Sequence, residues 1–264
     1  MAIDWEASKE DWIARVRGEL FPRLHADQRF VDAGKLTARF DHEVAVWQKS
    51  GVIRQVIEIG NELAAAAKIL TRLQYDDSLQ YEPPISGTKK RLDFLRQTKK
   101  GEREWIEVKT VAPLWMDTDE QWQKYLLIAQ EFPENAKLVV AKEWEGAALS
   151  GQAIKARLSL VNHTLETEAR AALIPDAERG PVTLMFCSTG FAWHQDDLED
   201  FSDYYRSGKF RQDDWSRAAI SRYMGEQKLS FTRSLAGFHY LARKHEDVDA
   251  HEFFVCVRGP QIWA

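Results

Sequence analysis

The sequence predicts an α/β or α+β fold, and three observations lead to that prediction. Apolar residues recur with helical spacing near the start of the chain and again over residues 151–173. Runs around residues 92–108 alternate with the period of a β-strand, and short apolar runs follow at 136–141, 181–188 and 253–257. Helix, hairpin, strand, helix and strand in this order indicate a sheet flanked by helices.

The first part of the chain predicts helices before any strand. Residues 4–48 have mostly helical spacing, which Pro22 interrupts because proline removes a backbone donor. A second helix is predicted from about residue 53 to 73, with its apolar residues on one stripe. Four consecutive alanines, residues 64–67, would allow this helix to approach a sheet closely.

Residues 92–109 predict a β-hairpin whose register follows from the apolar pattern. If Phe94 pairs with Ile106, a five-residue turn remains from Thr98 to Glu102. Four apolar side chains then share the core face, namely Leu92, Phe94, Ile106 and Val108. A slip by one residue would bury the charged residues instead, so the pattern favours a single register.

The other face of the hairpin carries the candidate chemistry. In this register Asp93 lies directly opposite Glu107, and Lys109 follows on the same face. Two opposed carboxylates repel each other unless a cation lies between them, and an all-oxygen site suits a hard ion such as Mg²⁺. Lys109 can then reach water on the ion or a bound phosphate. The alternative is an exposed sheet face with ordinary solvated charges.

Later segments predict further helices, strands and a partner surface. A helix is expected over about 119–132, and a strand is expected at each of the three short apolar runs. Residues 191–223 interleave aromatic side chains with arginines, a composition that suits stacking on single-stranded bases or a protein interface. We favour the interface, formed with a second copy of the chain or another protein. His239, His245 and His251 are predicted in a polar loop before the last strand.

The hairpin residues resemble the PD-(D/E)XK nuclease superfamily. Its motif places an Asp on one strand and Glu-x-Lys on the next, as in Arg91-Leu92-Asp93-Phe94 and Trp105-Ile106-Glu107-Val108-Lys109. Leu92 stands where the family usually has Pro, a departure that is common in the superfamily. The resemblance covers roughly residues 54–142 and implies a restriction-endonuclease-like core with a mixed central sheet flanked by helices. The expected parts are an N-terminal helical segment (1–50), the core (51–190) and an extension packed on it (191–264).

The resemblance implies a metal-dependent nuclease that hydrolyses phosphodiester bonds, in DNA rather than RNA. Asp93 and Glu107 would hold Mg²⁺ or Mn²⁺, and Glu62 on the preceding helix would complete the metal site. Glu58, one turn earlier, is the alternative to Glu62. Lys109 would orient or help deprotonate the attacking water and stabilise the transition state.

Further residues are expected to bind nucleic acid or assist catalysis. Gln121 and Tyr125 resemble the Gln-x-x-x-Tyr of one exonuclease-containing branch, and Gln152 and Lys155 are rival candidates for that role. Residues 86–109 hold eight basic and four acidic groups, although the whole chain has a net charge of −5. This local excess can follow a phosphate backbone. The basic residues nearest the motif are Lys89, Lys90 and Arg91.

The sequence also excludes several function classes. It contains no phosphate-binding loop, no dinucleotide-binding fingerprint and no serine-hydrolase elbow. Two cysteines are too few for a disulfide scaffold or a four-thiolate metal site. No apolar stretch is long enough for a membrane helix, and the acidic N-terminus leads us to expect a cytoplasmic protein. The alternatives to a nuclease are an inactive binding module with the same fold and a small-molecule enzyme that uses the acidic face.

Overall fold

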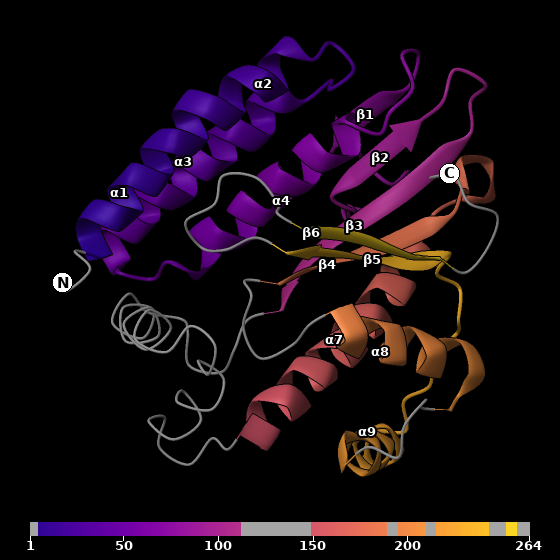
Figure 1. The fold of residues 1–264 in the computed structure, drawn as a ribbon. Coiled ribbons are helices and arrows are strands. Elements are labelled where there is room, and N and C mark those ends of the chain that lie inside the picture. Colours follow the sequence, from indigo (N-terminus) through magenta and orange to yellow (C-terminus); the bar gives the residue numbers. More distant parts are fainter. Residues whose placement is uncertain (1–4, 112–148, 189–194, 210–214, 243–251, 258–264) are drawn as a thin grey trace.

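A computed structural model of the chain describes residues 5–111, 149–188, 195–209, 215–242 and 252–257 (Figure 1). Four helices precede the first strand: α1 (Trp5–Arg15), α2 (Phe21–Ala26), α3 (Ala33–Ser50) and α4 (Arg54–Leu70). Within the described ranges after the hairpin, the α-helices are α7 (Leu149–Ala171), α8 (Gln195–Ser207) and α9 (Trp215–Glu226). The strands are β1 (Ser78–Tyr81), β2 (Phe94–Gln97), β3 (Arg103–Val111), β4 (Val182–Ser188), β5 (Gly237–Ala242) and β6 (Glu252–Val257).

The strands form one mixed sheet in the order β1-β2-β3-β4-β5-β6. The central strands β3, β4 and β5 are parallel, whereas β1 and β2 on one side and β6 on the other pair antiparallel with their neighbours. Parallel strands need long crossover connections, and α7 lies in the connection between β3 and β4. The predicted mixed sheet flanked by helices is therefore confirmed.

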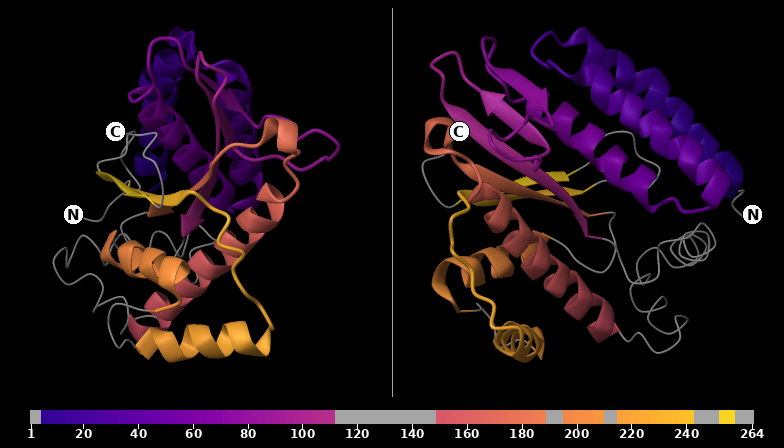
Figure 2. Two further views of the ribbon diagram at one scale, coloured as in Figure 1. Left: turned by 90° about the vertical axis from the view of Figure 1, so that its right-hand side faces the viewer. Right: turned by 180° about the vertical axis from the view of Figure 1, so that it is seen from behind.

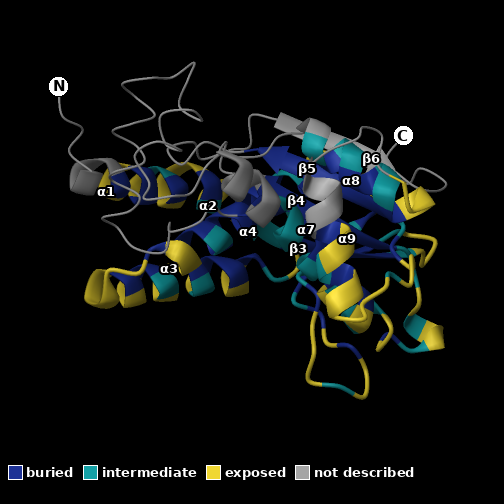
Figure 3. Ribbon diagram, turned by 90° about the horizontal axis from the view of Figure 1, so that it is seen from below, coloured by how far each residue is buried: buried dark blue, intermediate teal, exposed yellow. Residues whose placement is uncertain are grey.

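Helices cover both faces of the sheet (Figures 1 and 2). α4 packs on one face, with α1, α2 and α3 beyond it, and α7, α8 and α9 lie on the opposite face. Two separate apolar clusters fill these layers, one on each side of the sheet. The residues at 64–67 of α4 are all buried, as expected for a helix that lies close to a sheet. Figure 3 shows buried residues along the inner side of α3 and exposed ones along its outer side.

Pro22 changes the N-terminal helix without ending it. A π-helical turn from Val16 to Leu20 joins α1 to α2, and Pro22 lies in the first turn of α2. Proline lacks the N–H that an α-helix would use there, and a widened turn accommodates that loss. The predicted interruption therefore takes the form of a π segment, and the apolar side chains Trp12, Ile13, Val16 and Leu20 stay buried in one cluster.

The hairpin register is the predicted one. Phe94 pairs with Ile106, and the Thr98 amide donates to the Glu102 carbonyl at 2.9 Å across the turn. Phe94, Ile106 and Val108 lie in the cluster beneath α4. Leu92 is buried in the opposite cluster, so its predicted face is wrong. The reason is that the strand begins only at Phe94, and the chain before it does not continue the alternation.

Other predicted elements are confirmed, and some were missed. α4, α7, β4 and β6 occupy the ranges expected from periodicity to within a few residues. The predicted helix at 119–132 and strand at 136–141 lie outside the described residues. β1 and β5 were not predicted from the sequence. The prediction of His239 in a loop is wrong, because this residue is buried in β5. The division of the chain into an N-terminal segment, a core and an extension, with boundaries at residues 50 and 190, stays a prediction.

None of the helices in the described ranges combines the length and the apolar character that crossing a lipid bilayer requires. The cytoplasmic location stays a prediction.

We predict opposite stability effects for two glycine-to-alanine changes. A Cβ atom at Gly180, just before β4, would overlap the carbonyl group of Arg103 at the start of β3. Backbone atoms cannot move aside cheaply, so Gly180→Ala should lower the free energy of unfolding by about 1–3 kcal/mol. Gly225 lies near the end of α9 with open space around it, so Gly225→Ala should raise that free energy by about 0.5–1 kcal/mol.

Chemical denaturation of the two variants and the parent chain measures both effects. A Gly180→Ala variant as stable as the parent would contradict the close contact between the two strands.

Candidate active site

Asp93 lies immediately before β2, and its carboxylate takes part in joining β2 to β3. Its Oδ2 atom accepts a hydrogen bond from the backbone N–H of Val108 at 2.7 Å, and its carbonyl accepts one from the Glu82 amide at 2.7 Å. Burial raises the pKa of Asp93 well above its ordinary value, and the nearby carboxylates of Glu107 and Glu62 raise it further. Lys109 and the Val108 N–H act in the opposite direction without cancelling this rise.

Glu107 lies in the middle of β3 and is fully buried. Its Oε1 atom contacts two cationic side chains, Lys109 Nζ at 2.6 Å and Arg170 Nη1 at 2.5 Å. Its Oε2 atom is buried without a hydrogen-bond partner among the described residues. One oxygen is thus held by two cations, and the other is a buried acceptor without a hydrogen bond in the described part of the chain.

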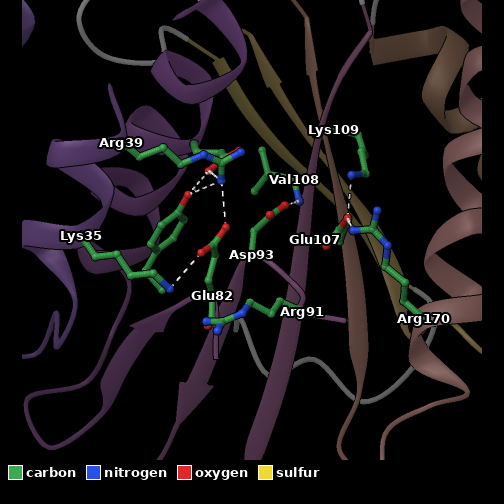
Figure 4. A network of polar contacts seen from close by, with 11 residues as sticks. Lys35, Arg39, Glu82, Arg91, Asp93, Glu107, Val108, Lys109 and Arg170 are labelled. Carbon is green, nitrogen blue, oxygen red and sulfur yellow. Dashed lines mark hydrogen bonds and ion pairs between the residues drawn. The ribbon is translucent and has the colours of Figure 1, made fainter. Parts of the chain in front are cut away.

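Asp93 and Glu107 are brought near each other, but they do not form the predicted cross-strand pair. The ladder between β2 and β3 begins at Phe94 and Ile106, so Asp93 lies just beyond it. Figure 4 shows the Asp93 carboxylate directed to the Val108 amide and the Glu107 carboxylate directed to Lys109 and Arg170. The two acids still influence each other, because the charge of Glu107 contributes to the raised pKa of Asp93.

Lys109 follows Glu107 on the same face of β3, as predicted. Burial alone would lower the pKa of Lys109, but the Glu107 and Asp93 carboxylates raise it above its ordinary value. The ammonium group therefore stays protonated at neutral pH. It can orient a water molecule or stabilise negative charge, whereas acting as a base would require it to lose this proton.

Glu62 of α4 lies on the opposite side of the sheet from α7, close enough for its charge to raise the pKa of Asp93. It is buried, accepts a hydrogen bond from the Tyr81 hydroxyl at 2.7 Å and lies 3.6 Å from Arg39 Nη1. Burial raises the pKa of Glu62 to about 7, although Arg39 and the Tyr81 hydroxyl oppose the rise. Glu58, the alternative, instead forms an ion pair with Arg54 on its own helix at 2.9 Å.

Helix α3 also contributes side chains, which the sequence analysis did not foresee. Arg39 donates to the Tyr81 hydroxyl at 2.7 Å and to Glu82 at 2.9 Å, and Lys35 pairs with the other oxygen of Glu82 at 2.8 Å. Glu82 has a left-handed backbone with φ of 42°, which is uncommon for a residue other than glycine. The polar groups in Figure 4 therefore extend from α3, across the hairpin, to α7.

The donor chemistry fits a hard divalent cation, because Asp93, Glu107 and Glu62 are all carboxylates. One of their oxygens, Glu107 Oε2, is also buried without a hydrogen-bond partner in the part of the chain that the structure describes. However, no three acidic, histidine or cysteine side chains within the described ranges lie close enough together to hold an ion as they stand. Binding one through all three carboxylates therefore requires their side chains to move.

Comparisons with known protein families, with curated proteins and with solved structures found no match. The resemblance to the PD-(D/E)XK superfamily therefore depends on the motif residues and their arrangement alone. Gln121 and Tyr125 lie outside the described residues. Gln152 and Lys155 belong to α7, but their side chains are not described.

The basic residues near the motif divide between the two ends of the hairpin. Lys89, Lys90 and Arg91 are exposed in the loop between β1 and β2, which leads directly to Asp93. Arg91 also donates to the carbonyl of Glu82 at 2.8 Å. Lys99 is exposed in the turn at the far end of β2. Only the first group is placed near the candidate site.

The aromatic segment expected to bind a partner contributes in part to the core. Tyr205 of α8 is fully buried, and its hydroxyl donates to Glu168 at 2.6 Å. Residues 210–214 of this segment lie outside the described residues. Burial of Tyr205 explains part of the aromatic composition without a partner, and the proposed interface stays a prediction.

The raised pKa of Glu62 predicts a pH-dependent stability in the absence of divalent ions. Glu62 ionises near pH 4.5 in the unfolded chain but near pH 7 in the folded one, so folding becomes less favourable as the pH rises between these values. Glu62→Gln keeps an acceptor for Tyr81 but cannot ionise. The free energy of unfolding of the Glu62→Gln variant should therefore rise relative to that of the parent chain as the pH increases from 4.5 to 8, by up to about 3 kcal/mol.

The measurement is chemical denaturation in a chelator at several pH values, with Glu58→Gln as the matched control on the same helix. A stability difference between Glu62→Gln and the parent that stays constant with pH would contradict the assignment.

Proposed function

We propose that the chain is a metal-dependent nuclease that hydrolyses phosphodiester bonds, with DNA rather than RNA as its substrate. The observation that carries the proposal is the arrangement of Asp93, Glu107 and Lys109 at one point of the β2–β3 hairpin, with Glu62 of α4 near enough for its charge to act on Asp93. The pairing of Phe94 with Ile106 and the single residue between Glu107 and Lys109 support the proposal.

The acidic groups support a site for Mg²⁺ or Mn²⁺. The charges of Glu107 and Glu62 both raise the pKa of Asp93, which means that ionised carboxylates are close enough to repel one another. A divalent cation bound by these carboxylates would remove that repulsion, lower the pKa of bound water and polarise the phosphate. In the folded chain, the Val108 N–H fixes the orientation of Asp93, and Lys109 and Arg170 fix that of Glu107.

Lys109 would act through its positive charge. Its ammonium group is largely shielded from solvent, with 19% of the side chain exposed, and it stays protonated beside Glu107. In this environment it can orient the attacking water and stabilise the charge that develops on the phosphate oxygens. Lys89, Lys90 and Arg91, exposed in the loop before Asp93, would bind phosphates on either side of the cleaved bond.

One observation favours an inactive nucleic-acid or protein binding module instead. Glu107 already has two cationic partners, and a site neutralised by side chains has less need of a metal ion. Binding by such a module would persist in a chelator and would be indifferent to substitution of Asp93. Metal-dependent cleavage separates the two functions.

The nuclease proposal predicts that Lys109→Ala and Asp93→Asn abolish cleavage while the fold survives. Asp93→Asn keeps an oxygen acceptor for the Val108 amide but removes the negative charge, and Lys109→Ala leaves Arg170 to pair with Glu107. Each should lower the rate of DNA cleavage by roughly a hundredfold or more, the size typical of a lost charge-stabilising group.

The assay uses double-stranded DNA, single-stranded DNA and RNA with Mg²⁺ or Mn²⁺, and circular dichroism verifies folding. Lys99→Ala, at the exposed turn of the same hairpin, is the matched control and should keep full activity. Full activity of Lys109→Ala, or no cleavage of any substrate by the parent chain, would count against a nuclease.

A further inference from the structure

Arg170 is a cationic side chain at the candidate site that the hairpin motif does not include. It lies in the last turn of α7, on the face of the sheet opposite α4. Its Nη1 atom is 2.5 Å from Glu107 Oε1, the same oxygen that lies 2.6 Å from Lys109 Nζ (Figure 4). Two full positive charges therefore converge on one carboxylate.

This cluster has more positive charge and more donors than Glu107 can satisfy. A guanidinium carries five N–H donors and an ammonium carries three. Only one oxygen of Glu107, Oε1, accepts from Lys109 and Arg170, so most of these donors are not used by Glu107. Within the described ranges, the Arg170 side chain forms its hydrogen bond and ion pair with Glu107 and is repelled by the charge of Lys109. With 32% of its side chain exposed, Arg170 can present its remaining N–H groups to a ligand from solvent.

The neighbouring residues do not remove this excess of positive charge. His163, seven residues earlier on α7, has its pKa lowered to about 4 by burial and by the charge of Lys109, so it is neutral near pH 7. Its Nδ1 atom lies 3.8 Å from Glu166 of the same helix, and that glutamate is exposed. Asp93 also attracts Lys109, but its carboxylate is directed to the Val108 amide rather than to Arg170.

We propose that Arg170 binds a phosphate group of the nucleic acid beside Lys109, as a substrate-contacting residue supplied by α7. A guanidinium binds a phosphate through two parallel hydrogen bonds, which Arg170 can form while one nitrogen remains near Glu107. This inference rests on the proposed nuclease function and adds to it a contact from helix α7, which lies outside the hairpin motif.

Two structural roles for Arg170 have to be distinguished from substrate binding. Arg170 neutralises Glu107, and a cation in the last turn also stabilises the helix through its dipole. Either role alone would change the stability of the protein without changing how strongly its affinity for nucleic acid depends on salt.

The test measures binding of a short DNA duplex by fluorescence anisotropy at several salt concentrations, in a chelator and again with Mn²⁺. The variants are Arg170→Gln, Arg170→Lys and the control Arg179→Gln, which removes an exposed arginine paired with Asp176 shortly after α7. Arg170→Gln should weaken binding roughly ten- to a hundredfold, the loss expected for a hydrogen bond to a charged group. The slope of log affinity against log salt should become shallower by about 0.9, the value for one phosphate contact.

Arg170→Lys should restore the salt slope and part of the affinity, and Arg179→Gln should match the parent chain. Unchanged affinity and salt slope in a folded Arg170→Gln variant would overturn the inference while leaving the nuclease function in place. A parent chain that neither binds nor cleaves nucleic acid in any condition would overturn the proposed function and the inference together.

Discussion

Helices cover strand β3 on both of its faces, and the candidate site depends on this constraint. A carboxylate in the middle of such a strand is removed from water, and a buried charge without a partner costs several kcal/mol. Glu107 is fully buried at this position, and Lys109 and Arg170 compensate its charge from the same strand and from α7. The electrostatics of the site therefore follow from the packing of helices on both faces of the sheet.

The backbone positions the second acidic residue. The Asp93 side chain accepts a hydrogen bond from the Val108 amide at the end of the β2–β3 pairing, so its carboxylate is fixed relative to Glu107 on the neighbouring strand. On the far side, Glu62 is held by Tyr81 and approached by Arg39. Side chains from two helical layers and a hairpin thus form one electrostatically connected group, in which a change at one acid alters proton binding at the others.

The elements in which apolar residues recur with a clear helical or strand period could be predicted from the sequence. The elements without such a period depend on long-range packing. The hairpin register followed from alternation because its apolar residues face one cluster. β1 has only four residues, and β5 is buried along its whole length, so neither shows a clean alternation. Asp93, Glu107 and Lys109 could be found because they are close in sequence. Arg170 and Arg39 could not, because they reach the site from helices distant along the chain.

The contacts of α3 with the residues beside the hairpin determine whether the chain can be shortened at its N-terminus. Arg39 and Lys35 bind Tyr81 and Glu82 beside the hairpin, and Arg39 also neutralises part of the charge of Glu62. A shortened chain starting after α3 would leave these acids uncompensated and would expose the apolar surface that α4 shares with α3. The N-terminal helices are therefore part of the structural unit that contains the site, and trimming them would not yield an autonomous minimal fragment.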